Sequence, residues 1–360
     1  MTKKLKWLMG CLVSAAIHGG PAAANTDWDK TVIAAKKEGS VVISALSGEL
    51  LRQVLLSFEQ DYPGIKVKYT AGNLRDFWPV VYKEREVGQY LWDLRIGGVD
   101  AATYQAKDKG LLDPILPRLV LPEVVDNKKW MTKGVAGLFG DSEGKYVLHT
   151  TGLLAGELIV NRDSAPESEL RTARDIIDPR WKGKIVMQDP RNGGSGTAGL
   201  ATLIQLYGEG FVRNLLSRQD IVVSDNRRQM AEWVVRNRYP IAIGLGSAGP
   251  ITQFQEQGLG KNIKPVPGYS AISGNAVVLM NKAPNPNAAK VYLNWLLSQK
   301  TQQRLADVGK TNSLRVDVKP GNPDFALDPK KASTYLDISD EKYATIKVRA
   351  QELAKELLPK

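Results

Sequence analysis

The sequence predicts an α/β fold made of two lobes, each a mostly parallel sheet flanked by helices. Short runs of β-branched residues alternate along the chain with segments of helical periodicity, which is the pattern of parallel sheets covered by helices. The chain has 360 residues, more than a single hydrophobic core usually serves, so two lobes are expected. Glycine and serine gather where predicted strands end, which is the edge at which open α/β sheets bind ligands.

The N-terminal segment has the three parts of an export signal. Three lysines stand within the first six residues, residues 7–17 are mostly apolar, and Ala22-Ala23-Ala24 offers a small-residue cleavage site. Crossing a bilayer takes about 20 apolar residues, so this run is too short for a retained anchor. Cleavage before Cys11, as in lipoproteins, would leave too little apolar sequence ahead of the cut. We therefore expect an exported protein with a signal peptide over residues 1–24, cut after Ala24.

Helices and strands alternate through the first half of the chain. Apolar residues recur every three or four positions in four segments, which predicts helices over 28–37, 50–58, 77–87 and 100–109. Short apolar or alternating runs predict strands over 41–43, 65–69 and 94–96. Three prolines at 114, 117 and 122 then interrupt the pattern. The order of strand, helix and strand is that of a parallel α/β sheet.

The second half of the chain has the same character. Strands are predicted over 185–187, 221–223, 241–243 and 276–280. Helices are predicted over 197–207, 227–236, 250–257, 287–297 and 341–357. The sequence does not repeat at a fixed short period, which argues against a solenoid or a propeller.

Four loops rich in small residues follow predicted strands, at 46–49, 97–100, 193–197 and 246–249. Small residues let the backbone approach a ligand closely, and the N–H groups at the start of the next helix favour an anion. Any one of these loops is equally well explained as an ordinary turn or cap. Four of them in one exported chain indicate a ligand-binding cleft.

The charge balance is basic, with 49 Lys and Arg against 38 Asp and Glu, for a net charge of +11. Removing the three lysines of the signal segment lowers this to +8. Such a charge is compatible with an anionic ligand, an anionic membrane surface or nucleic acid. The sequence has neither a long block of like charges nor a recurring aromatic and basic motif. Nucleic acid is therefore not expected as a partner.

Residues for catalysis are scarce. His149 is the only histidine outside the signal segment, and Ser195 lies in no G-x-S-x-G motif because Thr197 takes the place of the last glycine. Zinc would need more histidines or cysteines, and neither a P-loop nor a G-x-G-x-x-G motif follows a strand. We expect no catalytic residue, no metal and no cofactor. An exported hydrolase is the weaker alternative.

Several stretches spread over the chain resemble a known family. They are Tyr62-Pro63-Gly64 with the following Ile65-Lys66-Val67, residues 179–185 with Ser195-Gly196-Thr197, and residues 276–279, 287–290 and 295–297. In these the chain resembles the periplasmic solute-binding proteins of ABC importers, in the type 2 group (extracellular solute-binding protein family 1) that includes ferric-iron binders. The resemblance implies a two-lobed type 2 periplasmic binding protein fold with crossing strands. Lobe one would comprise 25–101 plus 271–320, and lobe two 102–270 plus 321–360.

The resemblance also implies a function. Such a protein would close its lobes over a small solute in the periplasm and deliver it, as a monomer, to an ABC permease in the inner membrane. A protein that presents its ligand to a membrane sensor kinase would have the same sequence features, and this alternative stays open.

The sequence departs from the ferric-iron binders of the group. Those proteins carry adjacent tyrosines in the loop that corresponds here to 246–250, and this chain has none there. Ser47 lies near the position where some relatives have a histidine, and Gly98 stands where a metal-binding carboxylate is expected. Ferric iron needs anionic oxygen ligands, so these loops disfavour it. Ferric-iron binding remains as an alternative.

We expect a solute with a carboxylate, phosphonate or phosphate group, because the four loops lack the aromatic residues on which neutral sugars stack. Lobe two would hold the anion by backbone N–H and hydroxyl groups of Ser195, Gly196 and Thr197. A guanidinium of Arg191, Arg227 or Arg228 would clamp the same oxygens. The remaining candidates are Ser47, Gly48, Gly97, Gly98, Thr150, Thr151, Ser247 and, against an organic body, Tyr269.

Overall fold

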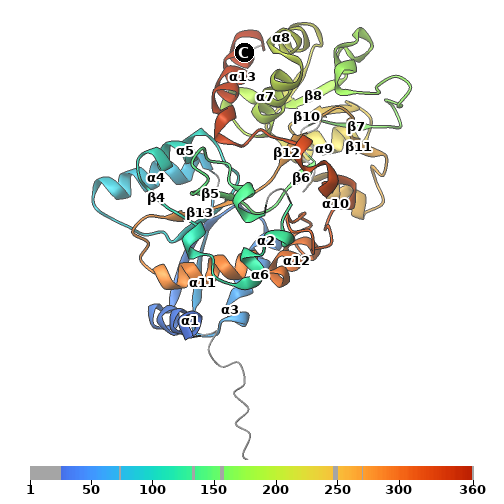
Figure 1. The fold of residues 1–360 in the computed structure, drawn as a ribbon. Coiled ribbons are helices and arrows are strands. Elements are labelled where there is room, and N and C mark those ends of the chain that lie inside the picture. The colour runs from blue at the N-terminus through green and yellow to red at the C-terminus, as the bar shows by residue number, and fades with distance from the viewer. Residues whose placement is uncertain are drawn as a thin grey trace, which may run out of the picture.

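The structure is a computed structural model that describes residues 26–72, 74–131, 134–154, 158–245, 250–269 and 271–358. It shows two lobes, one above the other in Figure 1, connected through a short middle region. The expected signal peptide and its cleavage site after Ala24 lie outside the described residues, as does Ser247. In the described part of the chain, every helix is too short or too polar to cross a membrane.

The sheet of lobe one has the order β2-β1-β3-β13-β4, and β5 also pairs with β13. Its strands are β1 (Ser40–Ala45), β2 (Lys66–Ala71), β3 (Leu94–Gly97), β4 (Leu112–Asp113), β5 (Val147–His149) and β13 (Ala276–Met280). β1 is parallel to β2 and β3, as expected. β13 is antiparallel to β3, β4 and β5, so it runs against the common direction of β1 to β5, and the sheet is mixed but mostly parallel in strand direction, as expected.

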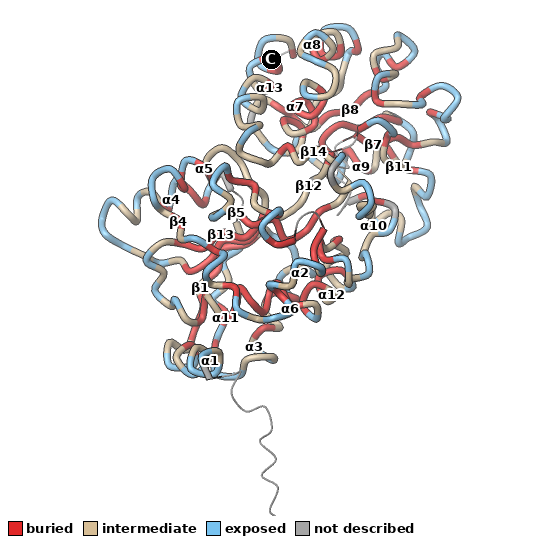
Figure 2. The backbone as a smooth tube through the Cα atoms, in the orientation of Figure 1, coloured by how far each residue is buried: buried red, intermediate tan, exposed pale blue. Residues whose placement is uncertain are grey.

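Helices cover both faces of this sheet. One face buries residues of α1 (Thr26–Glu38), α2 (Glu49–Leu56), α3 (Phe58–Asp61), α6 (Pro122–Val125), α11 (Pro286–Leu297) and α12 (Gln299–Asp307). There Phe58 packs 4.8 Å from Tyr292 and 5.2 Å from Trp295, measured between ring centroids. The other face buries residues of α4 (Leu74–Glu86) and α5 (Ala101–Asp108). The buried stretches of the strands are drawn in red in Figure 2.

The expected boundary of lobe one at residue 101 is wrong. β4 and β5 both pair with β13, and Ile115, Trp130 and Leu138 are buried in the lobe-one core. The segment from α5 to His149 therefore belongs to lobe one. The sequence hides this because the pairing partner of β5 lies more than 120 residues further along the chain.

The sheet of lobe two has the order β11-β7-β10-β8-β9. Its strands are β7 (Leu158–Asn161), β8 (Ile185–Gln188), β9 (Val222–Ser224), β10 (Ile241–Ile243) and β11 (Ile263–Pro265). β8 is parallel to β9 and β10, whereas β7 is antiparallel to β10 and β11. One face packs on α7 (Ser195–Tyr207), α8 (Glu209–Arg218) and α13 (Ala344–Leu357), and the other on α9 (Arg227–Val235) and α10 (Pro250–Glu256).

A third, small sheet joins the lobes, and we call it the hinge sheet. Its order is β14-β12-β6, with β6 (Leu153–Leu154), β12 (Ala271–Ser273) and β14 (Leu336–Asp337). The chain passes between the lobes along each of these strands, so the expected crossing strands are present. Short 3-10 helices complete the chain at Leu116–Arg118, Asn127–Lys129, Val135–Leu138, Ala173–Ile177, Pro179–Trp181, Pro190–Asn192, Pro323–Phe325, Pro329–Thr334 and Glu341–Tyr343.

Candidate functional site

Two of the predicted loops meet at one edge of the lobe-one sheet. β1, β2 and β3 are parallel, so their carboxyl ends share an edge, and the loops 46–49 and 97–100 both start there. A Cβ atom added to Gly97 would lie 3.0 Å from Cγ of Leu46, so the two loops are in contact. Ser47 and Gly48 are exposed, Gly98 is half-buried and Gly97 is buried. Ser47 and Gly48 are therefore the candidate residues at this edge that are most accessible to a solute.

Thr150 and Thr151 lie at the same edge but are engaged within the protein. Thr150 donates from its amide (2.8 Å) and its hydroxyl (3.1 Å) to the carbonyl of Asn275. The amide of Asn275 in turn donates to the hydroxyl of Thr151 at 3.0 Å. Both threonines are buried. These contacts tie the end of β5 to the start of β13, where the chain enters and leaves the hinge.

Arg95 is a residue at this edge that sequence reasoning missed. It lies on β3, only 2% exposed, and its guanidinium stacks 4.9 Å from the ring centroid of Phe77. Nη1 donates to the hydroxyl of Ser44 at 2.8 Å, and Nη2 lies 3.5 Å from the carbonyl of Gly72. Within the described residues Nε has no hydrogen-bond partner and the guanidinium forms no ion pair. The only feature of the sequence that could have pointed to Arg95 is its position as a basic residue inside an apolar strand.

Burial lowers the pKa of Arg95 to about 10, with Asp100 acting in the opposite direction. The side chain is therefore charged at neutral pH. Because an unpaired charge inside a protein is screened less than one in water, it places a positive potential beneath the loops at this edge.

The start of α7 is the corresponding feature of lobe two. Gly194, the residue before the helix, has φ 89°, a conformation that favours glycine. The amide of Gly196 donates to Oε1 of Gln188 at 2.9 Å, and the hydroxyl of Thr197 donates to the carbonyl of Pro190 at 2.7 Å. These two groups were expected to face the ligand, but internal acceptors occupy them. In the described part of the chain, no acceptor bonds the amides of Ser195 and Thr197.

The end of β10 packs directly against the start of α7. A Cβ atom on Gly244 would lie 2.5 Å from the amide nitrogen of Gly196, and one on Gly196 would lie 2.1 Å from the carbonyl oxygen of Gln188. Side chains at these two positions would push the backbones apart. The two glycines therefore bring the chain that leads to the loop 246–249 next to the amides at the start of α7.

The three predicted arginines lie at the carboxyl edge of the lobe-two strands, but other groups of the protein engage their guanidinium groups to different extents. Arg191 holds Asp189 through Nε (2.9 Å) and Nη2 (2.8 Å), which raises the pKa of Arg191. Arg227 donates from Nε to the carbonyl of Leu245 at 3.2 Å. Arg228 is exposed at the start of α9. Tyr269 is 6% exposed and packs in the lobe-two core.

The register places both edges beside the hinge. Gly97 on β3 pairs with Ala276, which pairs with His149, and the chain leaves lobe one just beyond these residues. In lobe two, Leu158 pairs with Ile243, so the chain enters at the carboxyl end of β10. The carboxyl edges of the two sheets are thus the ones that adjoin the hinge sheet, and they hold most of the candidate residues in the described part of both lobes.

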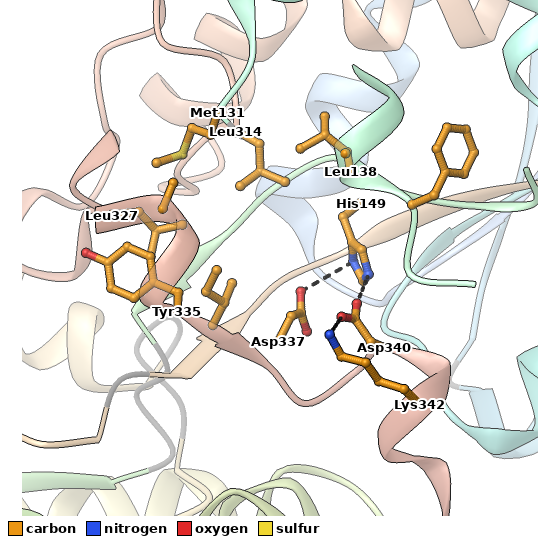
Figure 3. A pocket seen from close by; sticks show the side chains of 13 residues that line it. Met131, Leu138, His149, Leu314, Leu327, Tyr335, Asp337, Asp340 and Lys342 are labelled. Carbon is orange, nitrogen blue, oxygen red and sulfur yellow. Dashed lines mark ion pairs between the residues drawn. The ribbon is translucent and has the colours of Figure 1, made fainter. Parts of the chain in front are cut away.

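A separate cavity of about 160 Å³ lies between lobe one and the C-terminal segment (Figure 3). His149, Asp337 and Asp340 line it, and their ligand atoms come within 4.8 Å of one another, close enough to raise the question of a metal ion. Asp337 faces Nδ1 of His149, however, and Asp340 faces Nε2. An imidazole offers one nitrogen to one ion, and here each nitrogen faces a different carboxylate, an arrangement that suits two ion pairs with the histidine better than a shared metal ion.

Comparisons with known proteins agree with this architecture. The model of the family described as bacterial extracellular solute-binding protein matches residues 123–309. An uncharacterised protein of Haemophilus influenzae is 24% identical over 264 residues, which is 71% of this chain and 72% of that protein.

Solved structures share the fold. Iron-bound HitA of Pseudomonas aeruginosa aligns with a TM-score of 0.66 at 16% identity, over 88% of this chain and 99% of its own. AfuA of Actinobacillus pleuropneumoniae, with fructose-6-phosphate bound, aligns with a TM-score of 0.64 at 21% identity, over 89% and 98%. A ferric binding protein of Campylobacter jejuni aligns with a TM-score of 0.68 at 18% identity, over 88% and 99%. The expected two-lobed type 2 fold is confirmed.

Proposed function

Because this chain belongs to the family of bacterial extracellular solute-binding proteins, we propose that it captures a small organic anion in the periplasm and delivers it to an ABC permease. The protein is exported by the signal peptide over residues 1–24 and works as a monomer without catalysing a reaction. The solute carries a carboxylate, phosphonate or phosphate group. It is enclosed when the carboxyl edges of the two lobes close on each other.

The observation that carries this proposal is a positive feature at the facing edge of each lobe. Lobe two offers the amides of Ser195 and Thr197 at the start of a 13-residue helix, whose dipole favours an anion. Lobe one holds beneath its loops the guanidinium of Arg95, which has no ion-pair partner among the described residues. An anion between the edges is attracted from both sides, which stabilises the closed form relative to the open one.

The solutes of structural relatives include a metal and a phosphate ester: HitA is iron-bound, and AfuA holds fructose-6-phosphate. We favour the second class for this chain. Ferric iron binds anionic oxygen ligands, whereas the loop 246–250 contains no tyrosine, and the loops 46–49 and 193–197 supply mainly N–H and hydroxyl donors. Such donors suit phosphate and carboxylate oxygens.

A thermal-shift screen tests the proposal. The panel holds sugar phosphates, phosphonates, dicarboxylates, uncharged sugars, amino acids and ferric citrate. A cognate solute at 100 times its Kd adds about 2.7 kcal/mol of stability, and we expect such a shift from a member of the three anionic organic groups. A shift confined to uncharged sugars would refute the anion class. A stoichiometric visible charge-transfer band with ferric citrate would show an iron-binding protein instead.

A further inference from the structure

The C-terminal segment is fastened to lobe one before it reaches lobe two. We call residues 337–343 the strap. Lys107 Nζ lies 2.7 and 2.9 Å from the two carboxylate oxygens of Glu341, and Oε2 of Glu341 also accepts from the amide of Ser142 at 2.7 Å. The amide of Glu341 donates to the carbonyl of Gly140 at 2.8 Å, and the hydroxyl of Tyr104 donates to the carbonyl of Ser339. Lys107 and Tyr104 are both buried.

The far end of the strap continues into α13, which is part of lobe two. Ala350 and Leu353 of this helix are buried in the lobe-two core. Arg349 pairs with Glu209 of α8 through Nη2 at 2.8 Å. The strap therefore connects the two lobes beside the hinge sheet. A change in the angle between the lobes must bend it or detach it from lobe one.

His149 is the titratable group at which the strap meets the end of β5. It is 5% exposed, with Nδ1 3.8 Å from Oδ2 of Asp337 and Nε2 3.4 Å from Oδ1 of Asp340 (Figure 3). Neither ring nitrogen forms a hydrogen bond within the described residues. A neutral imidazole donates from one nitrogen only, whereas an imidazolium donates from both. Two carboxylates facing the two nitrogens are therefore complementary to the protonated ring.

Other charged groups pack around this site. Lys342 Nζ lies 3.4 Å from Oδ2 of Asp340, and Lys347 of α13 also opposes protonation of the histidine. Tyr104 approaches from α5, but its hydroxyl donates to backbone carbonyls. Burial is the largest single influence on His149 and disfavours the charged ring. The attraction of Asp337 and Asp340 outweighs it, so the pKa of His149 is raised above its ordinary value of 6.5.

We propose that protonation of His149 locks the strap onto lobe one through Asp337 and Asp340, so that the hinge is held at acidic pH and released as the pH rises. The sign follows from the raised pKa of the histidine in the folded protein. The added stability is fully present below pH 6.5 and is lost as the pH rises through the higher value of the folded state. Each unit by which the pKa of His149 in the closed strap exceeds 6.5 corresponds to an approximately tenfold change in the equilibrium constant for strap opening.

Proton NMR measures the titration directly. The sequence has two histidines, His18 and His149, so the resonance of His149 is identified by its loss in His149→Gln. We expect a pKa above 6.5 that falls in Asp337→Asn and in Asp340→Asn. A value at or below 6.5, or one that both substitutions leave unchanged, would overturn the proposal.

Hydrogen exchange measures the lock itself. After correction for the intrinsic rate, the Glu341 amide should be better protected at pH 5.5 than at pH 8.5, by approximately tenfold per unit of pKa elevation. In His149→Gln the protection should be equal at both pH values. Glu341→Gln, which weakens the pair with Lys107, should lower protection at both pH values and keep their ratio. Equal protection at the two pH values in the unmodified protein would contradict the lock.

Discussion

Arg95 donates from Nη1 to the hydroxyl of Ser44 at 2.8 Å, and in the described part of the chain no carboxylate forms an ion pair with it. Arg315, equally buried at 2% exposure in the same lobe, is fully engaged. Its Nε and Nη2 each lie 2.9 Å from an oxygen of Asp317, and Nη1 donates to two backbone carbonyls. A buried charge without an ion-pair partner destabilises the fold, so we propose that Arg95, at the candidate ligand edge, has a role in binding.

We predict that Arg95→Met leaves the fold intact and weakens solute binding. A methionine of similar length removes the cost of burying the charge, so the free energy of unfolding should be unchanged or rise by about 1–4 kcal/mol. Affinity for the anion should fall by roughly tenfold or more, because the positive potential beneath lobe one is lost. Urea unfolding and calorimetric titration measure the two effects.

Arg315→Met is the matched control. It removes the two hydrogen bonds to Asp317, which keeps only Lys129 at 3.5 Å among the described residues. It also leaves the carbonyls of Glu123 and Leu297 without this donor, so we expect the free energy of unfolding to drop by about 1–3 kcal/mol. The affinity of the molecules that remain folded should be unchanged. If both substitutions destabilise the protein equally and neither alters affinity, Arg95 is a structural residue.

Ser195→Ala should weaken anion binding by ~1.5–3 kcal/mol, the scale of a hydrogen bond to a charged group. The hydroxyl stands at the first residue of α7, beside amides that have no acceptor among the described residues. Ser217→Ala on α8 is the control, since its hydroxyl donates to the carbonyl of Arg213 on the exposed surface. Calorimetry with both variants should show a change for Ser195 alone. If the affinity of Ser195→Ala were unaltered, the Ser195 hydroxyl would not contact the solute.

Gly196→Ala should destabilise lobe two. The added methyl would lie 2.1 Å from the carbonyl oxygen of Gln188, which is backbone and cannot move without disturbing β8. Overpacking of this kind costs about 1–3 kcal/mol. Gly210→Ala in α8 meets no atom within 4 Å and should stabilise by ~0.5–1 kcal/mol through helix propensity. Thermal unfolding of the two variants measures both changes in stability. If both substitutions raised or both lowered the melting temperature, the close packing inferred at Gly196 would be contradicted.

Acid should weaken the attachment of α13 to α8. Hydrogen bonds from Arg349 and Arg213 lower the pKa of Glu209 to about 2. A lowered carboxyl pKa gives stability that is present above the ordinary value of 4.5 and is lost as the pH falls toward 2. In Glu209→Gln, urea midpoints measured from pH 5 to pH 2.5 should fall less steeply than in the unmodified protein. Glu232→Gln, in an exposed pair with Arg236 at the C-terminal end of α9, controls for the loss of a surface carboxylate.

Much of the fold could be predicted from local sequence patterns. Val41-Val42-Ile43 and Ile185-Val186-Met187 lie in β1 and β8, and the predicted helix over 197–207 lies within α7. These patterns are visible because burial of one face imposes a short period on the sequence. The amphipathic helices α8 and α12, which carry many polar residues, were missed.

What could not be predicted depends on contacts distant in sequence. β5 joins lobe one because Leu148 pairs with Val277, and no local pattern reveals this. In the sequence Arg95 looks like an ordinary strand residue. The sequence does not show that its guanidinium is covered by Phe77, which lies on a separate helix. Gln188 was not considered for the site, yet its side chain binds the amide of Gly196. The sequence predicted which loops are candidates for the ligand site, whereas the availability of each donor in the described loops depends on these tertiary neighbours.

Small-angle X-ray scattering tests the central claim most directly, that a small anion is enclosed between the two lobes. The protein is titrated with the sugar phosphate, phosphonate or carboxylate that gives the largest thermal shift, and the radius of gyration is followed to saturation. The radius should fall as the lobes close, and the fall should require more solute in Arg95→Met and in Ser195→Ala. A radius that stays constant at saturating solute would contradict this account.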